Sequence, residues 1–321
     1  MPPRPLIDDD LAWAKWAEHW PLRSDTIYLN HGSFGPTPIC VQQARAQWEA
    51  IVAAQPMDFF VRRLEGELFV VREALAAFVG TQAENLALVD NATYGMNVVA
   101  ESFDLQPDDE VLLTDHEYGA VSRIWRRACD RREAKLVTAR LPLPVESADQ
   151  IVDAIKDAMT PRTRLLVISH ISSPTAITLP VAEIISAVNA AGVAVCIDGP
   201  HAVAQLPLNI DALDCDFYAA SCHKWLSAPL GTGFLYVHPR WQDRIAPPVL
   251  SWGKTDQEAT DTAWTDEFHW LGTRDPSAWL AIPSAIDFLK QVGLDAFRAR
   301  THHLARYARS RLLEFSDRPP V

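Results

Sequence analysis

The stretch RLLVISHISSPTAITLPVAEIISAVNAAGVAVCID, residues 164–198, contains two short apolar runs that flank a segment with a different period. LLVIS and VAVCI are continuous apolar runs of strand length, whereas PVAEIISAVNAA places its apolar residues at helical spacing. A strand, a helix and a second strand in this order predict parallel strands joined by a crossover helix. Because neither run alternates with polar residues, both strands are expected to be buried on both faces.

The same alternation extends outward along the chain. Helices are predicted for LEGELFVVREALAAFVG (64–80), which ends in a glycine stop, and for YGMNVVAESF (94–103). The predicted strands are LALVD (86–90), DEVLLTD (109–115), KLVTARL (135–141), RLLVISH (164–170), GVAVCID (192–198), DFYAAS (216–221) and GFLYVH (233–238). We therefore expect an α/β fold with a mostly parallel central sheet and helices on both of its faces.

Polar residues follow the predicted strands at the points where such sheets bind ligands, outside the carboxyl ends of the strands. They are Asn91, Ala92 and Thr93 after the first strand, His116 after the second, Ser173 after the fourth, Asp198 and His201 after the fifth, and Ser221, His223 and Lys224 after the sixth. Their chain positions predict that they meet at one edge of the sheet.

Lys224 lies in SCHKWLSAPLGTGFLYV, residues 221–237, between two runs that read as buried strands. Burial lowers the pKa of a lysine and makes it usable as an amine nucleophile. The alternative is a loop lysine whose ammonium group extends to solvent. Taken alone, this stretch leaves both readings open.

An aldehyde cofactor held by a lysine needs a carboxylate beside its pyridine nitrogen, a flat group over its ring and donors for its phosphate. Asp198 is a candidate for the carboxylate, His116 for the ring, and the helix start at residues 91–93 for the phosphate. Each residue also has a structural alternative, as a helix cap or a core histidine. Their joint placement after successive strands favours pyridoxal phosphate.

Composition and charge exclude several classes of function. The 321 residues are 48% hydrophobic and 22% charged, which is ordinary for a globular protein. A net charge of −12 argues against a nucleic-acid or anionic-membrane surface, and RIWRRACDRR (123–132) reads as the solvated face of a helix. We expect no nucleic-acid partner, no membrane span and, from MPPRPLIDDDLAWAKW at the start, a cytoplasmic protein.

The cysteines show no spacing of a metal site. They are Cys40, Cys129, Cys196, Cys215 and Cys222. Without a CxxC pair or a cysteine and histidine cluster, neither zinc nor any other metal is predicted, and free thiols in a reducing compartment are expected.

The motifs DNATYGMN, DHEYGA, SHISSPTA, CIDGPHAVAQLPLNI and YAASCHKWLSAPLGTGFLYV, taken in this order, resemble the class V aminotransferase family of fold-type I pyridoxal-phosphate enzymes. Within that family the chain looks most like the isopenicillin N epimerase-like branch. The resemblance covers Tyr28 to Phe288. It implies that the sheet belongs to the large domain of a fold-type I transferase.

The resemblance also implies roles for the candidate residues. Lys224 forms the internal aldimine, Asp198 pairs with the pyridine nitrogen and His116 covers the ring. His201 lies near the phenolic oxygen and Ser173 contacts the cofactor, while Ala92, Thr93, Ser221 and His223 hold the phosphate. Gly272-Thr273 reaches the phosphate of a neighbouring subunit, which makes a homodimer the expected assembly.

The substrate implied is an amino acid, and the sequence leaves its reaction open among epimerisation, transamination and β-elimination as a C–S lyase. A cysteine desulfurase is disfavoured because Cys222, the last cysteine, precedes Lys224. Arg274 is the candidate for the substrate carboxylate, with an ion pair to Asp275 or another acidic neighbour as its alternative. His31 is the candidate second base, with a structural turn residue as the alternative.

We expect three regions: an N-terminal arm with a short helix (1–30), a large cofactor-binding domain (31–275), and a C-terminal region (276–321) in which one long helix, followed by another, begins an incomplete small domain. The Trp-rich segment 252–270 lines a substrate pocket, or else packs an interface or the core. An incomplete small domain leaves open a catalytically impaired binding protein that keeps the fold. A nicotinamide enzyme is disfavoured because no GxGxxG turn follows an early strand.

Overall fold

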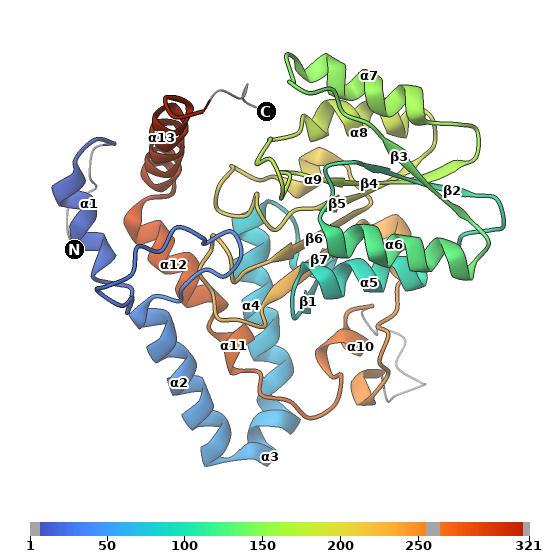
Figure 1. Ribbon diagram of the computed structural model, residues 1–321. Coiled ribbons are helices and arrows are strands. Elements are labelled where there is room, and N and C mark those ends of the chain that lie inside the picture. The colour runs from blue at the N-terminus through green and yellow to red at the C-terminus, as the bar shows by residue number, and fades with distance from the viewer. Residues whose placement is uncertain (1–6, 255–263, 317–321) are drawn as a thin grey trace.

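The computed structural model describes residues 7–254 and 264–316 and contains a seven-stranded sheet (Figure 1). The strands are β1 (Leu86–Val89), β2 (Glu110–Thr114), β3 (Lys135–Ala139), β4 (Thr163–Ser169), β5 (Ala194–Asp198), β6 (Phe217–Ser221) and β7 (Gly233–Val237). Their order in the sheet is β1-β7-β6-β5-β4-β2-β3. Six of them fall within a segment that the sequence predicted as a strand, and β4 begins one residue before its predicted segment, at Thr163.

Five neighbouring strands, from β3 to β6, are parallel, and β7 runs antiparallel to both β6 and β1. The prediction of a mostly parallel sheet is therefore confirmed. Since β1 lies antiparallel to β7, it points in the same direction as β6. The segments that follow β1, β4, β5 and β6 consequently leave the sheet at the same edge.

Thirteen α-helices are found in the described residues. They are α1 (Asp10–Ala17), α2 (Ile39–Ala54), α3 (Pro56–Asp58), α4 (Leu64–Val79), α5 (Ala92–Ser102), α6 (Gly119–Arg131), α7 (Ala148–Ala158), α8 (Val181–Asn189), α9 (Ile210–Leu213), α10 (Asp266–His269), α11 (Ser277–Leu280), α12 (Ile282–Val292) and α13 (Leu294–Leu313). The predicted helix over 64–80 is confirmed as α4, and Gly80 ends it with a φ of 75°.

Helices cover both faces of the sheet, as the unbroken apolar strands predicted (Figure 1). In β4, Leu166 and Ile168 pack into the hydrophobic cluster that contains α4, α7 and α8, while Leu165 and Val167 pack with α5 and α6. Successive strand side chains point to opposite faces, so each strand contributes to two cores. Burial of each large apolar side chain contributes about 1.5–3 kcal/mol to stability.

The arginines of 123–132 lie on α6, whose buried side includes Trp125 and Ala128. Arg127 and Arg131 both bind Glu101 of α5 at 2.9 and 3.0 Å. The predicted solvated helix face is thus confirmed.

The long helix predicted from residue 276 is wrong in detail. It is divided into α11 and α12 near Ala281, with Pro283 in the first turn of α12. Proline lacks a backbone N–H, so it suits a helix start and not a helix interior. Trp279 and Ile286 belong to the same core as α4, and the proposed domain boundary at 276 stays a prediction.

The last described helix, α13, has no buried residue along its 20 positions. It lies beside α1 in Figure 1, where Arg300 forms an ion pair with Asp10. Within the described part of the chain, no helix combines the length and the hydropathy needed to cross a bilayer.

Candidate active site

A cavity of about 970 Å³ opens at the sheet edge where β1, β4, β5 and β6 end. Nine of the predicted site residues line it, namely Asn91, Ala92, Thr93, Ser173, Asp198, His201, Ser221, His223 and Lys224. The cavity therefore brings together side chains that are up to 133 positions apart in the sequence, from 91 to 224. Residues from the N-terminal segment 29–34 and from α13 complete its wall.

Lys224 lies three residues beyond the end of β6, and its Nζ atom is 3.1 Å from Nε2 of His201. Burial lowers the pKa of Lys224, while the Asp198 carboxylate partly opposes that shift. A lowered pKa increases the fraction of neutral amine, which is the form that attacks an aldehyde. Lys224 is thus a partly buried amine with a lowered pKa, and its covalent role stays a prediction.

The protonation of His201 follows from its two neighbours. Burial, followed by the charge of Lys224, lowers the pKa of His201 to about 4, so the ring is neutral at pH 7. The indole N–H of Trp225 donates to Nδ1 at 3.4 Å, which leaves the ring proton on Nε2. Nε2–H then faces the nitrogen of Lys224 and favours its neutral form.

Asp198 ends β5 and is only 5% exposed. Its carboxylate makes no hydrogen bond or ion pair with any described residue, and burial raises its pKa to about 6, partly offset by Lys224. An ionised carboxylate at such a position is costly unless a cation pairs with it. A protonated pyridine nitrogen supplies that cation, so the site fits the ring of pyridoxal phosphate.

The start of α5 also lines the cavity. Asn91 caps the helix by accepting a hydrogen bond from the amide of Tyr94 at 2.9 Å, and Ser221 Oγ accepts one from the amide of Ala92 at 2.9 Å. The Thr93 amide belongs to the first turn, whose N–H groups have no acceptor within the helix. His223 adds a buried Nδ1 without a partner among the described residues. The Thr93 amide, the Ser221 hydroxyl and the His223 ring thus fit a phosphate group.

His116 follows β2 but is not among the residues that line the cavity. Its ring is buried, and Nδ1 lies 3.1 Å from the hydroxyl of Thr175. Thr175 in turn contacts the hydroxyl of Ser172. The proposal that His116 covers the cofactor ring stays a prediction. The hydroxyls of Thr175 and Ser172 would fix the orientation of the His116 imidazole.

The N-terminal segment packs directly on the lysine loop. The amide of Gly35 donates to the carbonyl of His223 at 2.9 Å, and a Cβ atom at Gly35 would lie 1.9 Å from the Lys224 carbonyl oxygen. Only glycine permits this approach. His31 stacks on Trp225 with ring centroids 6.2 Å apart, outside the cavity lining, and its role as a second base stays a prediction.

Thr273 and Arg274 also lie outside the cavity lining. Arg274 forms an ion pair with Asp90 at 2.5 Å, and its guanidinium lies 4.2 Å from the ring centroid of Trp279. The structure thus contains the alternative predicted for Arg274, an ion pair with an acidic residue, but the partner is Asp90 and not Asp275. Asp275 instead contacts Arg45 and Ser277.

The Trp-rich segment does not line the cavity in its described part. Trp252 is exposed, whereas Trp264, Phe268 and Trp270 pack into or against the cores. Residues 255–263 lie outside the described residues. The expectation of core packing is therefore met by three of these aromatic residues.

Sequence reasoning missed several residues of the site. Gln205, Trp225, Thr301, His302 and Arg306 line the cavity, although none of them was predicted as a site residue. Trp225 directly follows Lys224 in the sequence, and this position could have indicated that it lies at the site. The three residues of α13 carried no signal, because nothing local indicates that this helix approaches the sheet edge.

Glu117 is a further residue that the sequence left without a role. Its carboxylate accepts hydrogen bonds from the hydroxyls of Thr114 and Ser169, both at 2.6 Å. Burial raises its pKa from an ordinary 4.5 to about 7, opposed by these hydrogen bonds and aided by the charge of Asp198. Glu117 thus ties the end of β2 to the end of β4, beside His116.

Glu117→Gln is expected to change how stability depends on pH in the cofactor-free protein. A raised carboxyl pKa means that the folded state favours the protonated form, so this stabilisation is complete below pH 4.5 and disappears as pH rises through about 7. The change is on the order of 3 kcal/mol. The free energy of unfolding, measured in urea between pH 4.5 and 8, should therefore fall less steeply with pH in Glu117→Gln than in the unmodified protein. Parallel curves for the two proteins would contradict this assignment.

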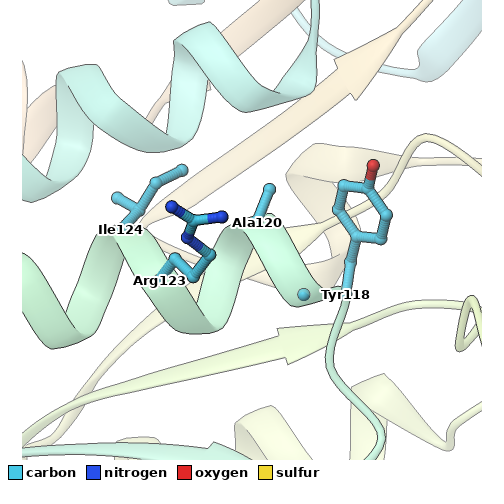
Figure 2. Close-up of a pocket in the computed structure, with 5 residues that line it drawn as sticks. Tyr118, Ala120, Arg123 and Ile124 are labelled. Atoms are coloured by element: carbon cyan, nitrogen blue, oxygen red, sulfur yellow. The ribbon is translucent and has the colours of Figure 1, made fainter.

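A second depression of about 510 Å³ lies at the start of α6 (Figure 2). Ala120, Arg123 and Ile124 come from the helix, and Tyr118 lies just before it. Tyr118 is the residue that this depression shares with the larger cavity. None of the predicted site residues lies in it.

A lysine amine, an acidic partner for a ring nitrogen and an anion site on this type of sheet define a fold-type I enzyme that uses pyridoxal phosphate. The chain belongs to the Aminotransferase class-V family, whose model matches residues 55–318. Both the fold class and the cofactor inferred from the sequence are thereby confirmed.

Relatives and solved structures agree with this family. The chain is 39% identical to isopenicillin N epimerase of Streptomyces clavuligerus, over 96% of this chain and 80% of the relative. It is 26% identical to an L-cysteine desulfhydrase of Arabidopsis thaliana, over 92% of this chain and 67% of the relative. The fold matches C-DES, solved with glycine covalently linked to its PLP cofactor, at a TM-score of 0.77 and 23% identity, over 86% of this chain and 74% of that one.

Proposed function

We propose that this enzyme moves the proton at the α-carbon of an amino acid, as an epimerase does, with pyridoxal phosphate held by Lys224 as a Schiff base. The observation that carries the proposal is the 3.1 Å contact between Lys224 Nζ and His201 Nε2 in a cavity that also exposes the unpaired Asp198. The 39% identity to an isopenicillin N epimerase supports epimerisation over transamination.

The bound cofactor withdraws electrons from the bonds at the substrate α-carbon. Asp198 keeps the ring nitrogen protonated, while the α5 start, Ser221 and His223 bind the phosphate. Lys224 would be the base that removes the α-proton, because burial favours its neutral form. His201 orients that amine through its Nε2–H.

β-Elimination is the second candidate, as in a C–S lyase. It is favoured by the similarity to an L-cysteine desulfhydrase, and it needs only the same base and cofactor. With L-cysteine, removal of the α-proton would be followed by cleavage of the Cβ–S bond and release of sulfide, and hydrolysis of the three-carbon product would give pyruvate and ammonia. Sulfur transfer to a protein cysteine is disfavoured, because no cysteine is among the described residues that line the cavity.

The two candidates separate in one experiment with the cofactor-loaded enzyme in D₂O. Proton NMR follows loss of the α-hydrogen from a panel of L-amino acids, and chiral chromatography measures the D-enantiomer. We expect deuterium exchange accompanied by the D-form, without accumulation of oxo acid. Sulfide and pyruvate from L-cysteine without racemisation would select elimination, and no exchange with any amino acid would refute the proposal.

We also propose that the enzyme is a homodimer in which Thr273 reaches the phosphate site of the neighbouring subunit. Thr273 is exposed and lies outside its own cavity. Large apolar side chains are exposed near the site entrance and elsewhere, including Leu29, Phe34 and Leu230. Light scattering at micromolar concentration measures the mass, and a monomer would contradict the assembly.

A further inference from the structure

One wall of the large cavity is polar and is formed by α13 and the segment after β5. Thr301, His302 and Arg306 contribute from α13, and Gln205 faces them from the other segment. His302 and Arg306 lie on the same face of the helix, because four residues advance it by about 400°, and Thr301 lies next to His302 at the border of that face. None of these four residues has a role in the cofactor chemistry proposed above.

Gln205 is 7% exposed, and its Nε2 atom has no hydrogen-bond partner among the described residues. Its Oε1 atom lies 3.3 Å from the hydroxyl of Thr301. That hydroxyl also lies 3.0 Å from the carbonyl oxygen of Phe297, and it has a single hydrogen to donate. A buried amide donor without an acceptor costs free energy unless a ligand supplies one.

Arg306 is exposed on the same wall and makes no ion pair with a described residue. Asp198 is the one acidic side chain among the described residues that line the cavity, and in the proposed function it pairs with the ring nitrogen of the cofactor. Arg306 therefore has no acidic partner in the cavity. A free guanidinium and a free amide donor on one wall match a carboxylate.

We propose that Gln205 and Arg306 bind a second carboxylate, carried on the side chain of the amino-acid substrate. This inference rests on the proposed function, because the reacting amine and the α-carbon must lie at Lys224. His302 and Thr301 complete the wall with further hydrogen-bonding groups. The substrate class is thus an α-amino acid with an anionic side chain.

The test measures binding to the cofactor-loaded enzyme by calorimetry, with L-glutamate and its neutral isostere L-glutamine. The unmodified enzyme is expected to bind L-glutamate more tightly. Arg306→Ala should weaken L-glutamate binding about fivefold and leave L-glutamine unchanged, since an exposed ion pair contributes modestly. Gln205→Leu should weaken L-glutamate binding about tenfold, since it removes a hydrogen bond to a charged group.

Arg309→Ala is the matched control, because Arg309 is exposed on the same helix and does not line the cavity. It should leave both affinities unchanged. If Arg306→Ala weakens the binding of L-glutamate and L-glutamine equally, Arg306 binds the α-carboxylate. If the two ligands bind equally well and the substitution changes neither affinity, Arg306 has no role in binding. Either result overturns the inference while the proposed function stands. Absence of binding by every amino acid would overturn both.

Discussion

Replacing Lys224 with alanine is expected to abolish covalent retention of pyridoxal phosphate and to reduce α-proton exchange by about 10³-fold or more. The substitution removes both the amine that holds the cofactor and the proposed base. Borohydride treatment followed by mass spectrometry should find the reduced cofactor on the peptide that contains Lys224 in the unmodified enzyme. The same peptide in the variant should carry none.

Lys156→Ala provides the matched control for this substitution. Lys156 is exposed on α7, where it lies 3.7 Å from Asp153, and it does not line the cavity. Its removal should preserve labelling and exchange. Cofactor attached to another lysine in unmodified enzyme, or exchange that survives in Lys224→Ala, would refute the assignment.

Asp198→Asn is expected to reduce exchange by about 10²- to 10³-fold, because the neutral amide no longer stabilises charge on the ring nitrogen. Burial raises the pKa of Asp198 to about 6 in the cofactor-free protein. Cofactor affinity should therefore fall in the unmodified protein as pH drops below about 6, where the carboxyl becomes protonated. Fluorescence titration of pyridoxal phosphate at pH 5 to 8 should show this dependence, and Asp198→Asn should lack it.

Asp216→Asn separates a catalytic loss from a folding loss. Asp216 is also buried, immediately before β6, but its carboxylate binds Arg240 and the indole of Trp241. Removing that charge should lower the unfolding temperature. The dependence of cofactor affinity on pH should remain that of the unmodified protein. Identical cofactor binding profiles for the two variants would contradict a specific role for Asp198.

The strands and the cofactor residues were predictable because their signals are local. An unbroken apolar run such as LLVIS specifies a strand buried on both faces, whatever its partners are. Parallel strands then bring their carboxyl ends to one edge, so the residues just beyond β5 and β6 had to approach each other. Asp198 and Lys224 were found in this way.

Other features depended on packing that no local pattern encodes. Pro283 was visible in the sequence, but the continuous apolar spacing around it suggested a single helix where the structure has α11 and α12. Arg274 had several acidic residues within reach in the sequence, and only the fold selected Asp90. The protonation preference of Glu117 arises from burial between the ends of two strands.

The sequence by itself determined the sheet and the cofactor, and it predicted Lys224 as the residue that holds the cofactor, because strand periodicity and the order of motifs are properties of the chain. Only the tertiary structure brought Gln205 and Arg306 to the same cavity. Gln205 and Arg306 are 101 positions apart, from 205 to 306, and they share a wall because α13 passes the sheet edge. Such proximity follows from long-range packing, which residue spacing does not record.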